Sequence, residues 1–83
     1  MFSEEEDMTM DIVTTNSGDK IKITEKTKYN GFDHDIKLLN KHLIIDVEYT
    51  VDHIDINGWM SDVYLKEVPN VAFNTVNFEN VKI

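Results

Sequence analysis

Residues 42–68 read HLIIDVEYTVDHIDINGWMSDVYLKEV, and apolar and polar side chains alternate on both sides of an Asn-Gly pair. Alternation with a period of two is typical of a β-strand that buries one face. Asn57-Gly58 favours a two-residue hairpin turn, because both central positions of that turn need a positive φ. We therefore predict a β-hairpin with a first strand over residues 42–51, continued past a bulge through residues 52–56, and a partner strand over residues 59–68.

The same alternation assigns the two faces of the hairpin. The face predicted to be buried carries Leu43, Ile45, Val47, Tyr49 and Val51 on the first strand, and Trp59, Val63 and Leu65 on the second. The opposite face carries acidic side chains together with Met60 and Tyr64. An antiparallel sheet commonly keeps one face in water, so we expect the acidic side to be solvated.

Turn residues divide the rest of the chain into further short strands. Residues 20–29 alternate most regularly, with Ile21, Ile23, Thr27 and Tyr29 on one face and Lys20, Lys22, Lys26 and Lys28 on the other. We also predict strands over residues 8–15, 71–73 and 78–83, turns at residues 16–19, Asn30-Gly31 and Pro69-Asn70, and a 3₁₀ turn over residues 74–77.

Residues 33–41 leave two interpretations open. Ile36, Leu39 and Leu43 are spaced for one helical face, with Asp33 or Asp35 as the N-cap. Such a helix would have at most a turn or two. A long, partly apolar loop folded over the end of the sheet fits the same residues equally well.

The composition favours strands over helices. Isoleucine and valine dominate the apolar residues, whereas leucine occurs four times, alanine once, and arginine and glutamine not at all. The 83-residue length allows one domain, which we place at residues 8–83 after an acidic, mobile tail at residues 1–7. The predicted fold is all-β: a small five- to six-stranded barrel or sandwich with at most one short helical turn in a long loop.

From about residue 19 to residue 83, the order of elements resembles an SH3-like barrel. A strand at residues 20–25 is followed by a long loop, the hairpin, and the segment VAFNTVNFENV at residues 71–81. In that family a short fourth strand, a 3₁₀ turn and a final strand end the domain in a similar aromatic-turn-aromatic-acid pattern. The resemblance implies a scaffold but not polyproline recognition, because Asn74 stands near the position of the family's proline and the first strand lacks the aromatic-rich motif.

The chain also resembles small proteins of bacteriophage genomes, which use lysine, asparagine and isoleucine in place of arginine, glutamine and alanine. Its first seven residues are acidic, whereas a secretory signal would be basic and then apolar. No apolar run approaches the roughly 18 residues of a membrane span. We therefore expect a cytoplasmic protein, in the host cytoplasm if a phage encodes it.

Charge is the feature that most restricts function. Sixteen carboxylates stand against eight lysines, for a formal net charge of −8 at pH 7. Residues 1–19 and 42–67 are acidic, and residues 20–41 are basic. This field should repel nucleic acids and attract basic protein surfaces. The lysines of residues 20–41 could contact phosphate, but we expect them to pair with neighbouring carboxylates or to protect an edge strand from aggregation.

The acidic side of the hairpin is the predicted partner-binding surface. Exposed Met60 and Tyr64 would form the apolar centre of an acidic patch, as interface hot spots do. The alternative is an ordinary polar outer face of a half-solvated sheet. The residues predicted to bind the partner are Asp46, Glu48, Asp52, Asp55, Met60, Asp62 and Tyr64.

The sequence gives less support to metal binding or catalysis than to partner binding. Asp33-His34-Asp35 has the donor types for zinc or manganese, and His42 or His53 could join it, but a solvated loop with a helix-capping aspartate fits better. No cysteine is present, the serines lie outside any Gly-x-Ser-x-Gly elbow, and each glycine is isolated in a turn. We expect no enzyme activity, no cofactor and no bound metal.

The preferred functional hypothesis is a non-enzymatic inhibitor or modulator that binds a basic surface of a host nucleic-acid enzyme, as anti-restriction and anti-CRISPR proteins do. Such a protein would be a monomer or homodimer that does not bind nucleic acid directly. The alternative is a structural or accessory SH3-like module, such as a subunit of a larger assembly. If the chain is such an inhibitor, its binding to the partner should weaken with salt, and if it is a structural module, its assembly should not.

Overall fold

A computed structural model describes residues 9–58 and 60–81 of the chain. Five antiparallel strands form one sheet in the order β4-β3-β2-β1-β5, which confirms the predicted all-β class. The elements in chain order are β1 (Lys20–Lys22), α1 (Asp33–His42), β2 (Tyr49–Asn57), β3 (Met60–Leu65), β4 (Phe73–Asn74), the 3₁₀ turn η2 (Thr75–Asn77) and β5 (Glu79–Asn80).

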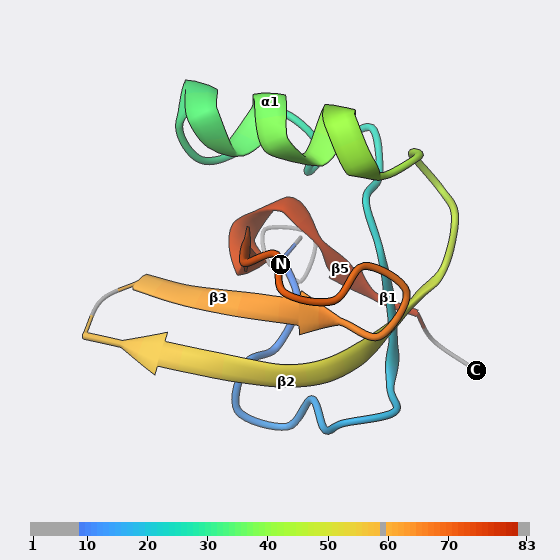
Figure 1. Ribbon diagram of the computed structural model, residues 1–83, viewed down its shortest axis with the longest axis vertical. Helices are drawn as coiled ribbons and strands as arrows, with labels where there is room; N and C mark the ends of the chain where they lie inside the picture. The colour runs from blue at the N-terminus through green and yellow to red at the C-terminus, as the bar shows by residue number, and fades with distance from the viewer. Residues whose placement is uncertain (1–8, 59, 82–83) are drawn as a thin grey trace, which may run out of the picture.

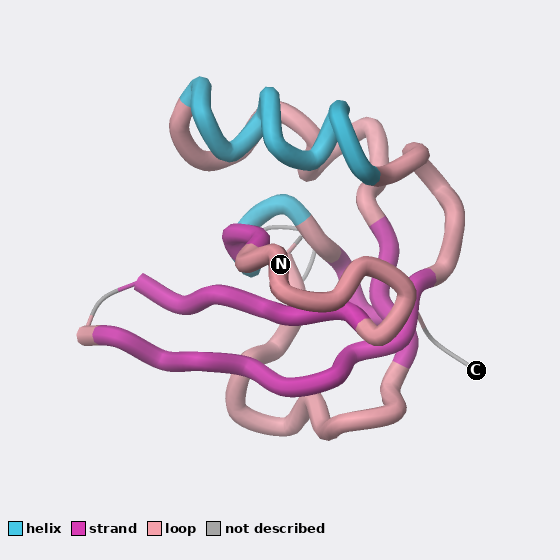
Figure 2. The backbone as a smooth tube through the Cα atoms, in the orientation of Figure 1, coloured by secondary structure: helices cyan, strands magenta, loops and turns pink. Residues whose placement is uncertain are grey.

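The two long regular pieces of the structure lie on opposite sides of it. Figure 1 shows the β2–β3 hairpin in the lower half, above the blue loop that leads to β1, α1 along the upper edge, and the segment from β4 to β5 between hairpin and helix. Figure 2 shows that most of the remaining chain is loop. Helix α1 contacts β4, and β3 contacts both β4 and η2. Among the described residues, no helix combines the length and apolarity required to cross a bilayer.

Strand β2 carries the bulge that the sequence predicted. Its first residues, Tyr49 and Thr50, pair with β1, and the residues from Val51 onward pair with β3. The register shifts between Val51 and His53, so Asp52 is the extra residue. A bulge bends its strand, and β2 can therefore belong to both halves of the sheet.

The hairpin turn lies one residue later than predicted. Asn57 pairs with Met60 and so belongs to β2 rather than to the turn, and Gly58, which follows it, has a φ of +61°. This register sets Ile54 opposite Val63 on the core side of the sheet. A one-residue slip would turn both side chains to the outer face, and the core therefore selects the register.

The core confirms most of the predicted inward positions. Ile21, Ile23, Val51, Val63 and Leu65 were predicted to face inward and are at most 1% exposed. Phe73 and Phe78, for which no face was predicted, are equally buried. Phe73 and Phe78 meet edge to face, with ring centroids 6.2 Å apart. Two inward predictions were wrong: Tyr29 is 71% exposed and Val47 is 40% exposed, because neither lies in a strand. Trp59, also predicted to face inward, lies outside the described residues.

Helix α1 resolves the ambiguity at residues 33–41, and it is longer than the turn or two predicted. Its ten residues make about 2.8 turns. Phe32, rather than Asp33 or Asp35, is the N-cap residue, and its backbone N–H donates to the Asp35 carboxylate at 3.0 Å. Asp33 and Asp35 in the first turn and Lys41 and His42 in the last complement the helix dipole. Buried Leu39 attaches the helix to the core.

Three predicted strands are shortened or replaced by turns. The described part of residues 8–15 forms no strand, because the Asp11 carboxylate accepts the backbone N–H groups of Val13 and Thr14. These hydrogen bonds, with Val13 first, lower the pKa of Asp11. The strand predicted at residues 20–29 ends at Lys22, since residues 25–29 form turns. The strand predicted at residues 42–51 begins only at Tyr49.

The end of the chain follows the predicted order of a short strand, a 3₁₀ turn and a final strand. Asn74 caps η2, because its side-chain oxygen accepts the Val76 backbone N–H at 3.2 Å. Asn77 is fully buried, and its amide donates to the carbonyls of Thr27 at 3.0 Å and Asn30 at 2.8 Å. Asn77 thus attaches the turn at residues 25–30 to the C-terminal segment.

Candidate partner-binding face

The outer side of the β2–β3 hairpin gathers five of the seven residues predicted to bind a partner. Ser61, Val63 and Leu65 of β3 are buried, so the alternate residues point outward. The register places His53 opposite Tyr64 and Asp55 opposite Asp62 on this outer side. We name this surface the hairpin face; it consists of Asp52, His53, Asp55, Met60, Asp62 and Tyr64.

Asp55 and Asp62 form a like-charge pair at the centre of the hairpin face. They are direct cross-strand partners, a position in which Cβ atoms lie about 5 Å apart. Like charges in this position destabilise a sheet. Among the residues that the structure describes, no lysine lies within salt-bridge distance of either carboxylate. The pair therefore costs folding free energy and leaves two negative charges available to a partner.

This cost can be measured with one substitution. We expect Asp62→Asn to raise the free energy of unfolding by about 0.2–1 kcal/mol at pH 7 and low salt, because it removes the cross-strand repulsion. Urea denaturation would measure the change. Glu48→Gln is the matched control, since it removes one charge from an exposed position before β2. A loss of stability in Asp62→Asn would contradict the repulsion.

Two acids away from the hairpin face, Glu25 and Glu67, have a salt-bridge or hydrogen-bond partner. Lys28 pairs with Glu25 at 2.8 Å, and this hydrogen bond raises the pKa of Lys28. Burial raises the pKa of Glu67, but hydrogen bonds from the backbone N–H and hydroxyl of Thr50 outweigh that effect and lower it. These partnered acids lie next to β1, the start of β2 and the turn at residues 25–29. The centre of the hairpin face lacks such partners among the described residues.

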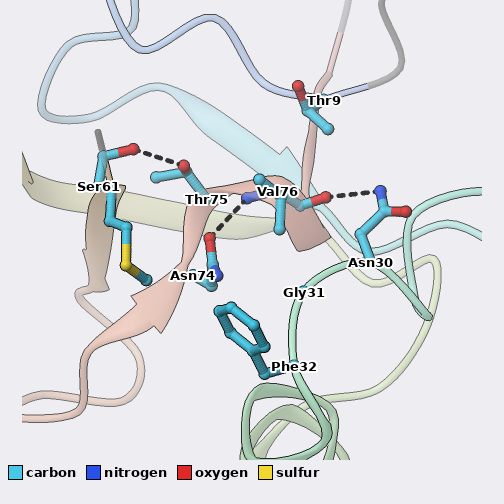
Figure 3. A pocket seen from close by; sticks show the side chains of 9 residues that line it. Thr9, Asn30, Gly31, Phe32, Ser61, Asn74, Thr75 and Val76 are labelled. Atoms are coloured by element: carbon cyan, nitrogen blue, oxygen red, sulfur yellow. Dashed lines mark hydrogen bonds between the residues drawn. The ribbon is translucent and has the colours of Figure 1, made fainter.

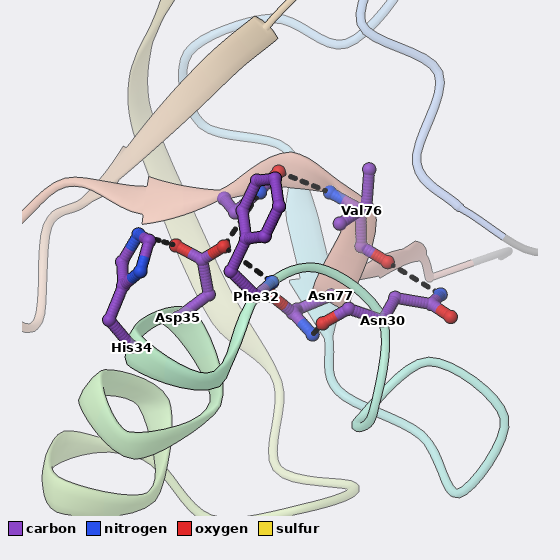
Figure 4. A network of polar contacts seen from close by, with 7 residues as sticks. Asn30, Phe32, His34, Asp35, Val76 and Asn77 are labelled. Atoms are coloured by element: carbon purple, nitrogen blue, oxygen red, sulfur yellow. Dashed lines mark hydrogen bonds and ion pairs between the residues drawn. The ribbon is translucent and has the colours of Figure 1, made fainter.

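The acidic row continues from the sheet to the helix. Asn74 of β4 pairs across the strands with Asp62, and its side-chain amide donates to the Asp35 carboxylate at 3.1 Å (Figure 4). We name Asp55, Asp62 and Asp35, with Asn74 between the last two, the carboxylate row. Sequence analysis missed Asn74 as a site residue, and its only signal was its place as the first residue of the predicted 3₁₀ turn at residues 74–77.

Beside the carboxylate row, the hairpin face carries a stacked pair. The rings of His53 and Tyr64 have centroids 4.4 Å apart and are nearly parallel. Asp52 lies 2.7 Å from Nδ1 of His53, and these residues border a hollow of about 290 Å³ with Pro69 and Asn70. The contribution of His53 to this face was also missed, although the alternation places it opposite Tyr64.

Asp46 and Glu48, also predicted to bind the partner, are not brought to the hairpin face. Both are exposed in the connection between α1 and β2. The Asp46 backbone N–H donates to the carbonyl of Ile23 at 2.7 Å, and Asp46 has a φ of +69°. This hydrogen bond holds the connection beside Ile23, just after β1, whereas regular pairing of β2 starts only at Tyr49.

The Asp33-His34-Asp35 motif is part of the helix start. One Asp35 oxygen accepts from Phe32 and Asn74, and the other lies 3.5 Å from Nε2 of His34. His42 is at the opposite end of α1, where its ring meets Phe73 edge-on. Within residues 9–58 and 60–81, no three histidine or acidic side chains are grouped as metal ligands.

A pocket of about 420 Å³ lies where the carboxylate row meets α1. Phe32, Met60 and Val76 supply its apolar walls, and Asn30, Asn74 and Thr75 are among its polar lining residues (Figure 3). Phe32 and Met60 are 59% and 44% exposed, so both present apolar surface at this pocket. We name this hollow the α1–β3 pocket.

Comparison with known proteins yields one family. A family model described as "Bacteriophage T4 protein Y07B" matches residues 20–83, which include strands β1 to β5, α1 and η2 of the described part of the chain. No curated protein and no solved structure matches the chain.

Proposed function

Because this chain belongs to the bacteriophage T4 protein Y07B family, we propose that it is a small phage protein that binds a basic protein surface and modulates it without enzyme activity. The observation that carries this proposal is the directly opposed Asp55–Asp62 pair. A repulsive pair that opposes folding is consistent with selection for binding rather than for stability.

The proposed partner is a host enzyme whose basic groove binds nucleic acid. A net charge of −8 and the absence of arginine make the chain a poor ligand for nucleic acid and a good one for the groove that holds it. The carboxylate row would there take the place of backbone phosphates, as expected for an inhibitor of the anti-restriction or anti-CRISPR type. Its site of action would be the host cytoplasm.

The scaffold that presents this row is, in our proposal, an SH3-like barrel. The support is the order of elements: a first strand, a long connection, a hairpin, a short β4, the turn η2 and a final β5. The long connection holds α1 and thereby brings Asp35 to the sheet.

Affinity capture from a bacterial host lysate at low salt, followed by mass spectrometry, would identify the partner. Calorimetry with the purified partner should then show one-to-one binding. We expect the affinity to fall at least tenfold between about 50 mM and about 300 mM salt, because the interaction is between exposed charges. DNA should compete with the chain. Failure to bind any basic protein at low salt, or binding indifferent to salt, would overturn the proposal.

A second candidate function is a structural or accessory module of a larger assembly. The observation that favours it is the exposure of Ile44 and Val47, at 67% and 40%, in the connection before β2. Assembly through these side chains would be insensitive to salt. Light scattering over the same salt range separates the two functions, since only this second one yields large particles at high salt.

A further inference from the structure

We propose that the α1–β3 pocket receives an arginine side chain of the basic protein partner. This inference rests on the proposed function and adds to it the identity of the residue that anchors the partner. A pocket that fills at the centre of an interface is where binding energy concentrates, and arginine is among the residues enriched there.

The walls of the pocket suit the body of an arginine side chain. Phe32, Met60 and Val76 offer apolar contact to the three methylene groups of its stem. The Phe32 ring lies at the pocket (Figure 3), and a planar guanidinium can stack on its face. His34 already stacks on the same ring, with centroids 5.7 Å apart, and keeps it at the start of α1.

Charge complementarity selects a cation over a neutral side chain. None of the residues lining the pocket is charged, but two carboxylates adjoin it. Asp62 is on the outer side of β3, two residues after Met60 and opposite Asn74 of β4, and both of these neighbours line the pocket. Asp35 is bonded to Asn74, and its carboxylate would lie 3.0 Å from a Cβ at Gly31. A guanidinium has five donors for the Asp62 carboxylate, while Asp35, which already accepts from Phe32 and Asn74, contributes its negative charge.

The start of helix α1 does not reverse this preference. A helix N-terminus carries about half a positive charge, which would oppose a cation. Here the first turn holds two full negative charges, Asp33 and Asp35. Their sum outweighs the dipole, and the mouth of the pocket stays negative.

Nuclear magnetic resonance of the full chain tests the occupant directly. The probe is N-acetyl-arginine methylamide, and the matched controls are its citrulline and leucine counterparts. We expect the arginine probe to shift the methyl signals of Met60 and Val76 saturably, and the isosteric but neutral citrulline to bind at least about fivefold more weakly. A leucine probe that shifts both methyl groups as strongly as arginine would overturn the inference in favour of an apolar occupant.

Two variants separate the pocket from the rest of the surface. Phe32→Leu should weaken binding of the arginine probe about threefold, because the aromatic face is lost. Tyr29→Leu is the matched control, since Tyr29 is an exposed aromatic residue outside the pocket, and it should have no effect. Equal effects of the two variants would contradict the assignment.

The outcomes distinguish this inference from the proposed function. If a basic partner binds in a salt-dependent way but the arginine probe leaves Met60 and Val76 unshifted, the pocket assignment fails and the proposed function stands. If the probe binds as expected but no basic protein binds the chain at low salt, the proposed function fails.

Discussion

Replacing Asp55 and Asp62 together by lysine should abolish partner binding at ordinary salt. Each reversal exchanges an attraction for a repulsion with a basic surface, and we expect roughly 1–2 kcal/mol for each, or at least a 30-fold loss of affinity for the pair. The double variant keeps a like-charge pair across the strands, so its free energy of unfolding should stay close to that of the natural chain. Calorimetry with the captured partner would measure the loss.

The control for this experiment is the double variant Asp46→Lys with Glu48→Lys. Each variant replaces two acids by two lysines, so both change the net charge from −8 to −4, a gain of two for each substitution. Asp46 and Glu48 lie in the connection along the end of β1, away from the hairpin face. We expect this control to lose less than about fivefold in affinity. Equal losses in both double variants would mean that overall charge, and not the hairpin face, attracts the partner.

Asn77→Ala should remove a large part of the stability of the fold. The Asn77 amide is buried and donates to the carbonyls of Thr27 and Asn30, and alanine would leave both without this donor. The Thr27 carbonyl still accepts the Asn30 backbone N–H, so only the Asn30 carbonyl is left unsatisfied. An unsatisfied buried group costs about 1–3 kcal/mol, and we expect a loss of that size. A domain of this size has on the order of 5–10 kcal/mol in total. Urea denaturation followed by circular dichroism would measure the change.

Asn40→Ala is the matched control for this substitution. Asn40 is an exposed residue in the interior of α1, where alanine has the higher helix propensity. We therefore expect a slight gain of stability, of a few tenths of a kcal/mol. A loss below about 1 kcal/mol in Asn77→Ala would show that water replaces the amide at these carbonyls.

Much of the sheet could be predicted because its signals are local. Alternation identified β2 and β3, the bulge after Val51 and the inward positions Val63 and Leu65. Turn residues located η2 and the short strands around it. The errors fell where side chains compete with strand pairing for backbone groups, as Asp11 does, or where a helix continued into a predicted strand, as at His42.

The candidate site was predicted only in part, for a related reason. Alternation along a strand is enough to place Asp62 and Tyr64 on one face. Asp46 and Glu48 were assigned to the same face because the strand was predicted to begin at residue 42, whereas β2 begins at Tyr49. The stacking of His53 on Tyr64 depends on the pairing register, which the core selects.

Local chemistry of the chain was therefore sufficient for the hairpin, its acidic outer side and the 3₁₀ turn, because these depend on residues a few positions apart. Tertiary structure alone decided that Asp35, from a segment that the sequence left open as helix or loop, meets Asn74, the cross-strand partner of Asp62, beside the α1–β3 pocket. Asp35 and Asn74 are 39 positions apart, and their contact exists only after α1 packs on β4. Side-chain periodicity carries no information about such distant contacts, since they depend on how whole elements pack.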